Sequence, residues 1–441
     1  MHSALPKVLQ PLAGRPLLAH VLATARTLDP AAIYVVYGHG GDQVKEAFAD
    51  QDLEWVLQSE QLGTGHAVAQ ALPKIPDDTQ VLVLCGDVPL VRTRTLQRLL
   101  LDSASGDLAL LTAEVDDPSG YGRVLRNELG EVARVVEEKD ATPDERRVNE
   151  VNTGLLALAA GSLRRFLSKL DNDNAQGEYY LTDVIGLAVE RGIKVHGIVV
   201  DTPTEVLGIN DRAQLAYAER TVQRKIADEL MNRGVTFADP DRVDVRGELK
   251  AGTDVFIDVG AVFAGSVELG DRVTIGPYAV IADSKLGDGC VVHAHTVMRG
   301  VVAGPDCEIG PFARLRPGAN LASQVKVGNF VELKNSEVAD GSKINHLSYV
   351  GDTTVGRDVN IGAGTITCNY DGANKHRTVI GDRVFIGSGV ELVAPVEIGA
   401  DATIGAGSTI AKDAPAGELT LARSKQVTVP GWQRPKKKPK K

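Results

Sequence analysis

"IGDRVFIGSGVELVAPVEIGADATIGAGSTIAKD", residues 380–413, carries an aliphatic residue at every sixth position, and several of these residues are followed by glycine. Neither a helix, with about 3.6 residues per turn, nor an alternating strand, with a period of about 2, produces this spacing. It is typical of a parallel β-helix, in which every sixth aliphatic side chain points to the axis and a small residue lets the backbone turn the corner. The series comprises Ile380, Ile386, Leu392, Ile398, Ile404 and Ile410.

The same period occurs in shorter runs before this stretch, so we expect the β-helix to begin near residue 251. An Ile- and Gly-rich β-sandwich is the alternative, which we disfavour because sandwiches do not hold one period over so many repeats. The segment "TCNYDGANKHRTV", residues 367–379, breaks the period, and we predict that it protrudes as a loop and carries a site. The earlier copies are Leu269, Ile275, Ile281, Ile309, Leu315, Val355 and Ile361.

The first half of the chain, up to about residue 210, alternates short apolar runs with helical stretches. We predict buried strands in "AAIYVVYG" (31–38), "VLVLCGDVPL" (81–90) and "LALLTAEV" (108–115), with helices in "PLLAHVLATARTL" (16–28) and "TRTLQRLLLD" (93–102). This alternation indicates a parallel, doubly wound α/β sheet, whose ligands bind at the carboxyl ends of the strands. A single amphipathic helix at 213–234 is expected to connect the two halves. Its apolar face comprises Leu215, Val222, Ile226 and Leu230.

Composition limits the functional class. A net charge of −10 argues against nucleic acid as the main partner. Four cysteines that lie far apart indicate neither a zinc site nor a disulfide scaffold, and we expect them to be buried apolar residues. The absence of a leader pattern and of a long apolar run predicts a cytoplasmic protein without membrane insertion. The basic end "RPKKKPKK" (434–441) is expected to be solvated, with attraction for phosphate or coenzyme as the alternative.

Two groups of residues have the chemistry of active sites. Asp87 follows a predicted strand directly, where a carboxylate is well placed for a hard cation that bridges phosphates, although a surface turn is an equally simple explanation. Gly63, Thr64 and Gly65 stand at a probable helix start, whose free amide groups can bind a base or a phosphate, and Gln58 offers an amide that reads both donors and acceptors. This region is therefore a candidate nucleotide site.

In the repeats, His346 is the candidate for a catalytic residue. A lone histidine is more often structural, but Lys334 and Arg316 fall within a few coils of this one. Cationic groups around a neutral base point to an anionic substrate that is held while a proton is removed. Other polar residues that fall within a few coils of it are Tyr349, Asn360, Asn369 and Tyr370.

These motifs, in this order, resemble the family of bifunctional bacterial N-acetylglucosamine-1-phosphate uridyltransferase / glucosamine-1-phosphate N-acetyltransferases. The resemblance runs from Leu5 to about Pro435, and its most specific segments are "QLGTGHA", "DNDNAQGEYYLTD", "GPFARLRPGA", "VGNFVELKNS" and "NIGAGTITCNYDGANKH". It implies an α/β plus all-β fold, with a Rossmann-like nucleotidyltransferase domain and a left-handed parallel β-helix of hexapeptide repeats. The implied domains are an N-terminally incomplete uridyltransferase domain (1–212), a connector helix (213–234), an acetyltransferase domain (235–427) and a basic tail (428–441).

The resemblance also implies the substrates of the first domain, UTP and N-acetylglucosamine 1-phosphate, and a Mg²⁺ cofactor. Phosphoryl transfer to a phosphate nucleophile needs positioning and charge neutralisation more than it needs a base. By the same likeness Lys7 contacts the triphosphate, Gln58, Gly63 and Thr64 contact the uracil, Asp87 and Asn210 hold Mg²⁺, and Gly122, Glu137 and Asn152 hold the sugar.

For the second domain the resemblance implies acetyl transfer from acetyl-CoA to glucosamine 1-phosphate, in a homotrimer with sites between subunits. His346 would be the general base, and Arg316, Lys334, Tyr349 and Asn360 would hold the sugar phosphate. The resemblance implies that the final product is UDP-N-acetylglucosamine, which feeds peptidoglycan and lipopolysaccharide precursors. The residues implied on the acetyl-CoA side are Ala363, Asn369, Tyr370, Ser388, Ala406 and Arg423.

The start of the chain departs from the family pattern, in which a strand and a Gly-rich loop precede the segment that matches Leu5–Lys7. We expect the natural protein to begin earlier, because every later uridyltransferase residue is in place. The alternative is an enzyme of acetyl transfer alone, disabled for uridyl transfer. Two further alternatives are a non-catalytic assembly protein and a different sugar-1-phosphate nucleotidyltransferase whose β-helix only oligomerises.

Overall fold

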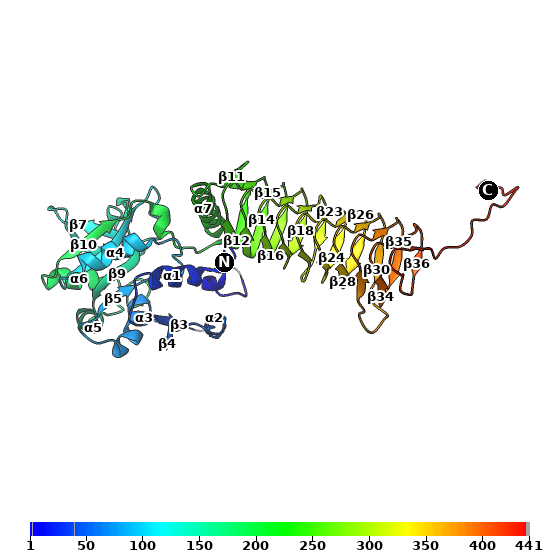
Figure 1. Ribbon diagram of the computed structural model, residues 1–441. Helices are drawn as coiled ribbons and strands as arrows, with labels where there is room; N and C mark the ends of the chain where they lie inside the picture. The colour runs from blue at the N-terminus through cyan, green and yellow to red at the C-terminus, as the bar shows by residue number, and fades with distance from the viewer. Residues whose placement is uncertain (2, 39, 438–441) are drawn as a thin grey trace. The chain divides into compact units, whose positions relative to one another are not determined.

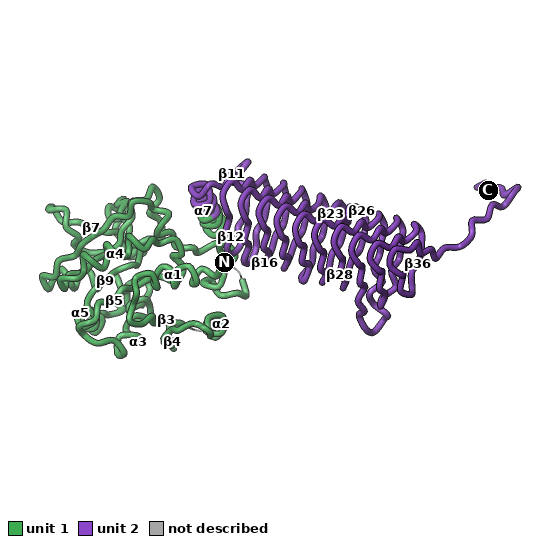
Figure 2. Tube along the Cα trace, in the orientation of Figure 1, with its two compact units in different colours: residues 1–222 green, residues 223–441 purple. Residues whose placement is uncertain are grey.

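The computed structural model describes residues 1, 3–38 and 40–437 (Figure 1). The chain divides into two compact units, Met1–Val222 and Gln223–Lys441 (Figure 2). The division falls inside helix α7 (Arg212–Met231), which occupies most of the expected connector. The last part of the predicted basic tail, residues 438–441, lies outside the described residues.

The first unit contains a six-stranded sheet, which is mixed rather than parallel as predicted. Strand β9 (Glu150–Ala159) runs antiparallel to β5, β6 and β7. The reason is that the chain enters β9 from the antiparallel β7–β8 pair and not through a crossover helix. The order is β10-β6-β9-β7-β8, with β5 also on β9. The other strands are β5 (Gln80–Val83), β6 (Leu108–Glu114), β7 (Arg123–Arg126), β8 (Val132–Val136) and β10 (Val195–Val199).

Helices pack the faces of this unit, as the apolar patterns predict. In α4 (Thr93–Asp102), Leu96 and Leu99 are fully buried and belong to the same core cluster as Leu111 of β6. The predicted helix at 16–28 is α1 (Leu17–Arg26). The remaining elements are η1 (Lys7–Leu9), β1 (Pro11–Leu12), β2 (Arg15–Pro16), α2 (Asp42–Ala47), α3 (Thr64–Ala71), η2 (Leu72–Lys74), η3 (Glu145–Arg147), α5 (Ala160–Leu167), α6 (Asp183–Glu190) and η4 (Pro203–Val206).

Two of the three strands predicted to be buried are only half-buried. Strand β6 is buried as predicted, but β3 (Tyr34–Tyr37) and β5 keep partly exposed side chains. In the described part of the chain, β3 pairs only with β4 (Glu54–Leu57) and β5 only with β9. Residues of both half-buried strands line one cavity of about 1450 Å³. The partial exposure of β3 and β5 follows from this cavity, because burial of a strand depends on what covers it as well as on its composition.

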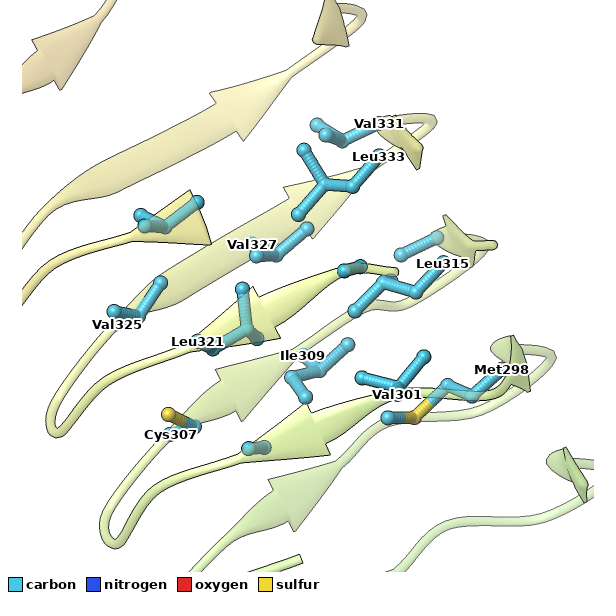
Figure 3. Packing of buried hydrophobic residues seen from close by; sticks show 14 of the residues in the cluster. Met298, Val301, Cys307, Ile309, Leu315, Leu321, Val325, Val327, Val331 and Leu333 are labelled. Atoms are coloured by element: carbon cyan, nitrogen blue, oxygen red, sulfur yellow. The ribbon is translucent and has the colours of Figure 1, made fainter. Parts of the chain in front are cut away.

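The second unit is a three-sided parallel β-helix, and it confirms the meaning of the six-residue period. All six residues of the series from Ile380 to Ile410 are buried, at 0–2% exposure. Side chains from successive strands, among them Ile309, Leu315, Leu321 and Val327, point into one continuous interior (Figure 3). The core is aliphatic and is shared by every coil.

The strands of the β-helix form two long parallel sheets. The eleven-stranded sheet comprises β11 (Thr236–Phe237), β13 (Phe256–Ile257), β15 (Thr274–Ile275), β17 (Val291–Val292), β20 (Glu308–Ile309), β23 (Lys326–Asn329), β26 (Lys343–His346), β29 (Asn360–Ile361), β32 (Phe385–Ile386), β35 (Thr403–Ile404) and β37 (Leu419–Thr420).

The sixteen-stranded sheet covers the other two sides, because its long first strands bend around a corner. These are β12 (Asp244–Ala251, after η5, Pro240–Arg242), β14 (Val262–Leu269) and β16 (Val280–Leu286). One row continues as β18 (Val297–Arg299), β21 (Arg314–Leu315), β24 (Glu332–Lys334), β27 (Tyr349–Gly351), β30 (Ile366–Cys368), β33 (Glu391–Val393) and β36 (Thr409–Ile410). The other row continues as β19 (Val302–Ala303), β22 (Asn320–Leu321), β25 (Glu337–Val338), β28 (Thr353–Val355), β31 (Thr378–Ile380) and β34 (Val396–Ile398).

The segment that breaks the period leaves the coil as predicted. Residues 369–377 lie between β30 and β31 and form the protruding hairpin in the orange part of the β-helix (Figure 1). The hairpin closes on itself through an antiparallel bridge between Tyr370 and Lys375.

Two further expectations are tested by the described residues. Cys290 and Cys307 are buried as predicted, but Cys85 and Cys368 are only partly buried. Within the described residues, no helix combines the length and the apolar character that crossing a membrane requires.

Candidate active sites

The cavity of the first unit brings together residues that are far apart in the sequence. Its lining includes Lys7, Thr64, Gly122, Glu137 and Asn152, all of which the family resemblance assigns to one nucleotide-sugar site. With a volume of about 1450 Å³, the cavity is large enough for a ligand of that class. The other residues assigned to this site, which lie outside the lining, are Gln58, Gly63, Asp87 and Asn210.

Lys7 joins the two predicted metal ligands. Its Nζ donates to Oδ2 of Asp87 at 2.5 Å and to Oδ1 of Asn210 at 2.9 Å. A carboxylate and an amide oxygen are hard donors of the kind that Mg²⁺ prefers, and Mg²⁺ usually keeps several of its waters. The donor set therefore fits the cation. In this structure the Lys7 ammonium donates hydrogen bonds to these same two oxygens.

The start of helix α3 is built around Gly63. Its φ of 106° is open to glycine alone, and a Cβ there would lie 2.7 Å from the carbonyl oxygen of Tyr179. The buried side chain of Gln58 donates from Nε2 to the Gly63 carbonyl oxygen at 3.1 Å, which fixes the amide against the helix start. The hydroxyl of Thr64 accepts from the backbone N–H of Leu181 at 3.2 Å.

Among the described lining residues of the cavity, Glu137 is the only carboxylate. Burial raises its pKa, and a hydrogen bond donated by the Thr182 hydroxyl at 2.9 Å opposes the shift only in part. Across the cavity edge, the backbone N–H of Asn152 donates to the carbonyl oxygen of Gly122 at 2.8 Å. These contacts hold the Glu137 carboxylate and the main chain of Gly122 and Asn152 in one wall of the cavity.

In the β-helix, His346 ends strand β26 and is exposed. Parallel register places it beside Asn329 of the preceding coil. Nδ1 of the imidazole lies 2.8 Å from Oδ1 of Asn329. Because an amide oxygen only accepts, this contact places the proton on Nδ1 and leaves the lone pair on Nε2, as a general base requires.

The two cations that the resemblance assigns to one site with His346 are each paired with a carboxylate. Arg316 Nη1 lies 3.0 Å from Oε1 of Glu332. Lys334 Nζ lies 3.8 Å from Oδ2 of Asp352, and this lysine side chain is only 20% exposed. Tyr349 begins β27 and pairs in register with Glu332 of β24. It therefore lies one coil after the strand that carries Lys334.

The residues predicted on the acetyl-CoA side follow one corner through successive coils. The Ala363 carbonyl oxygen accepts from Gly389 N at 2.7 Å, and the Ser388 carbonyl oxygen accepts from Gly407 N at 2.9 Å. Arg423 Nη1 then donates to the carbonyl oxygen of Ala406 at 2.8 Å.

Asn369 and Tyr370, two neighbours also predicted on the acetyl-CoA side, differ in their exposure to solvent. Asn369 is buried and hydrogen-bonded to Asp352, whereas Tyr370, the next residue, is 61% exposed at the base of the hairpin. Asn360 lies in register with Lys343 rather than with His346.

Sequence reasoning missed Asn329, Asp352 and Thr182. The first two carried a usable signal, because one coil advances the chain by 17 residues in this region and Asn329 precedes His346 by that interval. By the same rule Asp352 lies between Asn335 and Asn369, 17 residues to either side. Thr182 reaches Glu137 only through the folding of the first unit, and no sequence pattern announces that contact.

Comparisons with known proteins agree with both units. Residues 1–174 match the MobA-like NTP transferase domain, and residues 252–283 and 377–412 match the bacterial transferase hexapeptide family, described as six repeats. The hexapeptide match and the parallel strand order together describe a left-handed parallel β-helix.

Curated relatives cover nearly the whole chain. The bifunctional protein GlmU of Alkalilimnicola ehrlichii is 60% identical over 439 residues, which is 100% of this chain and 95% of the relative. The corresponding protein of Marinobacter nauticus is 56% identical, and that of Chromobacterium violaceum 55% identical, each over 99% of this chain and 96% of the relative. The chain therefore belongs to the family of the bifunctional GlmU proteins.

Proposed function

We propose that this chain makes UDP-N-acetylglucosamine by two reactions and that each unit carries one of them. Acetyl transfer from acetyl-CoA to glucosamine 1-phosphate is assigned to residues 235–427, and uridyl transfer from UTP to N-acetylglucosamine 1-phosphate to residues 1–212, with 213–234 as the connector and 428–441 as a basic tail. The observation that carries the proposal is that one chain holds both the His346–Asn329 pair and the Lys7–Asp87–Asn210 cluster. The alternative of acetyl transfer alone has no support in the family, whose relatives are named as bifunctional.

In the acetyltransferase site, His346 is the proposed general base. Its Nε2 accepts a proton from the ammonium of glucosamine 1-phosphate, and the free amine attacks the thioester carbonyl carbon of acetyl-CoA. A C–N bond forms and the C–S bond breaks, the nitrogen loses its second proton, and this proton neutralises the departing thiolate so that CoA leaves as its thiol. Arg316 and Lys334 are proposed to bind the sugar phosphate beside their present carboxylate partners, and Tyr349 and Asn360 to hold the sugar.

Acetyl-CoA is proposed to bind along the corner of the β-helix that leads away from His346. The support is the main-chain ladder through Ala363, Ser388 and Ala406, which presents small residues on successive coils. Arg423 offers a guanidinium at its end. Asn369 and Tyr370 would approach from the hairpin on the carbonyl side.

In the first unit, a phosphate oxygen of N-acetylglucosamine 1-phosphate attacks the α-phosphorus of UTP and pyrophosphate leaves. Lys7 neutralises the triphosphate, and Gln58, Gly63 and Thr64 hold the uracil, while Gly122, Glu137 and Asn152 hold the sugar. Asp87 and Asn210 would hold Mg²⁺, which neutralises phosphate charge when it is bound.

The active assembly is proposed to be a homotrimer. Along one corner of the β-helix, the rings of Tyr278, His295, Phe312 and Phe330 stack at centroid distances of 4.9–5.4 Å. Tyr278, Phe312 and Phe330 are 47–55% exposed, and Leu347, which follows His346, continues the row at 62%. We call this row the corner ladder. An apolar row of this length is typical of an interface, and a second copy of the chain is its proposed partner.

The proposed setting is the cytoplasm, where UTP and acetyl-CoA are made, and the product would feed peptidoglycan and lipopolysaccharide precursors. A dual assay of the full chain tests the two activities. CoA release is measured with glucosamine 1-phosphate, and pyrophosphate release with UTP and N-acetylglucosamine 1-phosphate. We expect both from the wild-type chain.

The variant His346→Ala is expected to lose CoA release by about 10²–10⁴-fold while it keeps pyrophosphate release, because a positioned general base contributes about that factor. His293→Ala is the matched control, since this histidine pairs with Glu308 elsewhere on the β-helix. Unchanged CoA release in His346→Ala would contradict the assignment of the base.

A further inference from the structure

Asp352 occupies a corner of the β-helix beside the acetyltransferase site and has no role in the reaction proposed above. It follows strand β27 with a φ of 49°, and only 12% of its side chain is exposed. A buried carboxylate needs partners that offset its lost hydration. The partners of Asp352 include residues assigned to both substrates of the acetyltransferase site.

The two oxygens of Asp352 bind different parts of the site. Oδ1 accepts from Nδ2 of Asn335 at 2.6 Å, one coil before it. Oδ2 accepts from Nδ2 of Asn369 at 2.5 Å, one coil after it, and lies 3.8 Å from Nζ of Lys334. Burial raises the pKa of Asp352, but the hydrogen bonds from the two asparagines and the charges of Lys334 and Lys375 outweigh it, so the pKa is lowered and the carboxylate is ionised.

The main chain of Asp352 strengthens the same links. Its N–H donates to the carbonyl oxygen of Lys334 at 2.9 Å, and its own carbonyl oxygen accepts from the N–H of Thr378 at 3.3 Å. Asn369 and Thr378 flank the protruding hairpin on its two sides. One residue therefore holds both ends of the hairpin and the lysine.

Asn369 transmits this restraint into the site. Its Nδ2 also lies 3.4 Å from the hydroxyl of Tyr349, and its carbonyl oxygen accepts from the N–H of His376 across the hairpin at 2.8 Å. The fit is close, since a Cβ on Gly351 would lie 2.9 Å from Nδ2 of Asn369 and nearer still to the Tyr349 hydroxyl.

We propose that Asp352 is a positioning residue for acetyl transfer, whose carboxylate fixes the lysine that holds the sugar phosphate relative to the hairpin that receives acetyl-CoA. The inference rests on the proposed acetyltransferase site. Asp352 does not touch the reacting atoms; it acts through Lys334 and Asn369. Attack of an amine on a thioester depends steeply on this kind of alignment.

Asp352→Asn is the sharpest test, because an asparagine keeps the shape and tolerates the left-handed corner. Its single amide oxygen accepts from either Asn335 or Asn369, and its NH₂ group then faces the other donor. Asp306→Asn is the matched control, since Asp306 has a φ of 58° at an exposed corner of the β-helix.

The kinetic expectation is a split between the two substrates. In Asp352→Asn, the KM for acetyl-CoA rises and kcat falls, each by about tenfold, the factor expected for the loss of one hydrogen bond to a charged group. The KM for glucosamine 1-phosphate changes little, because Lys334 keeps its charge and the neutral side chain of the variant no longer attracts it away from the phosphate, which offsets the loss of its fixed position. Uridyl transfer stays at the level of Asp306→Asn. A merely structural role would weaken both substrates or both activities together.

Hydrogen exchange of the hairpin amides, residues 369–376, provides a readout that does not need activity. Exchange is expected to be faster in Asp352→Asn than in wild type and Asp306→Asn. Equal exchange, or kinetics equal to those of Asp306→Asn, would overturn the proposal. A wild-type chain without CoA release would instead contradict the proposed function, and the exchange result would still decide whether Asp352 restrains the hairpin.

Gly351→Ala is a second variant in case Asp352→Asn does not fold. The new methyl group would lie nearest to the Tyr349 hydroxyl and 2.9 Å from Nδ2 of Asn369, so it displaces both side chains but leaves the Lys334–Asp352 pair in place. We expect a higher KM for acetyl-CoA and faster hydrogen exchange of the hairpin amides, with unchanged uridyl transfer. An unchanged KM for acetyl-CoA would also overturn the proposal.

Discussion

Oδ1 of Asn329 lies 2.8 Å from Nδ1 of His346, and this contact determines which nitrogen of the imidazole is free. The two residues stand on adjacent strands, β23 and β26, whose register is fixed by the β-helix. Leucine in place of Asn329 keeps the size of the side chain but removes the acceptor, so the imidazole loses its preferred tautomer and orientation.

We therefore expect Asn329→Leu to lower kcat for acetyl transfer by about tenfold or more, but by less than the ~10²–10⁴-fold expected for loss of the base itself. The measurement is CoA release at saturating substrates. Asn320→Leu, on the exposed side of β22, is the control and should match wild type. Equal rates for the two variants would mean that the contact does not orient the base.

The cluster of Lys7, Asp87 and Asn210 predicts how uridyl transfer responds to Mg²⁺. Asp87→Asn removes the only charged oxygen donor of this trio, so the Mg²⁺ concentration that gives half-maximal pyrophosphate release should rise by about tenfold or more, the effect of losing one charged ligand contact. The measurement is a Mg²⁺ titration of pyrophosphate release. CoA release should not change, and the exposed Asp52→Asn variant should titrate like wild type. An unshifted titration for Asp87→Asn would exclude this carboxylate as a ligand.

Glu137 predicts a pH dependence of stability, because burial raises its pKa. A carboxyl with a raised pKa in the folded state binds its proton more tightly there than in the unfolded chain. Its contribution therefore favours folding at low pH and is lost as the pH rises through the raised pKa. Glutamine at this position stays neutral, so the stability of Glu137→Gln relative to wild type should increase as the pH rises from the ordinary range of a glutamate through the raised pKa.

Denaturant unfolding at several pH values measures this difference, with the exposed Glu128→Gln as control. A difference that stays constant with pH would show that Glu137 titrates alike in both states. The same group predicts that the KM for N-acetylglucosamine 1-phosphate rises at acid pH in wild type, where the acceptor becomes protonated. This acid rise should be absent in Glu137→Gln.

The corner ladder predicts the subunit contact. Asparagine in place of Phe330 tolerates the left-handed backbone but removes the ring, which should weaken association by about 30-fold, since a buried aromatic anchor typically accounts for ~2 kcal/mol. Sedimentation equilibrium measures the oligomeric state. Val302→Asn changes a 51% exposed residue in the other row of the large sheet and should leave it intact. A trimer that is equally stable in both variants would place the contact elsewhere.

The local patterns of the sequence predicted those parts of the fold that depend on neighbours along the chain. The period of six placed Ile386 and Ile398 in the interior, and both are fully buried. The break in that period located the hairpin at 369–377. Such patterns are reliable because each coil repeats the same environment, so burial follows from position within the repeat.

Predictions that depended on distant neighbours were less accurate. The half-buried strands β3 and β5 have the composition of central strands, but their burial depends on what lies beside them. The direction of β9 was missed for the same reason, since strand direction follows from the connection and the pairing partner. The residues assigned to the two sites are carried by the family resemblance, and their roles stay predictions.

By itself, the sequence determined the β-helix, the alternating first unit and the family, because period, spacing and motif order are properties of the chain. Only the tertiary structure decided which side chains meet. It brought Lys7 to Asp87 and Asn210, Asn329 to His346, and Asp352 to Lys334 and Asn369. The physical reason is that hydrogen bonds and ion pairs act over a few ångströms, and strand register and chain crossing, rather than sequence distance, set those separations.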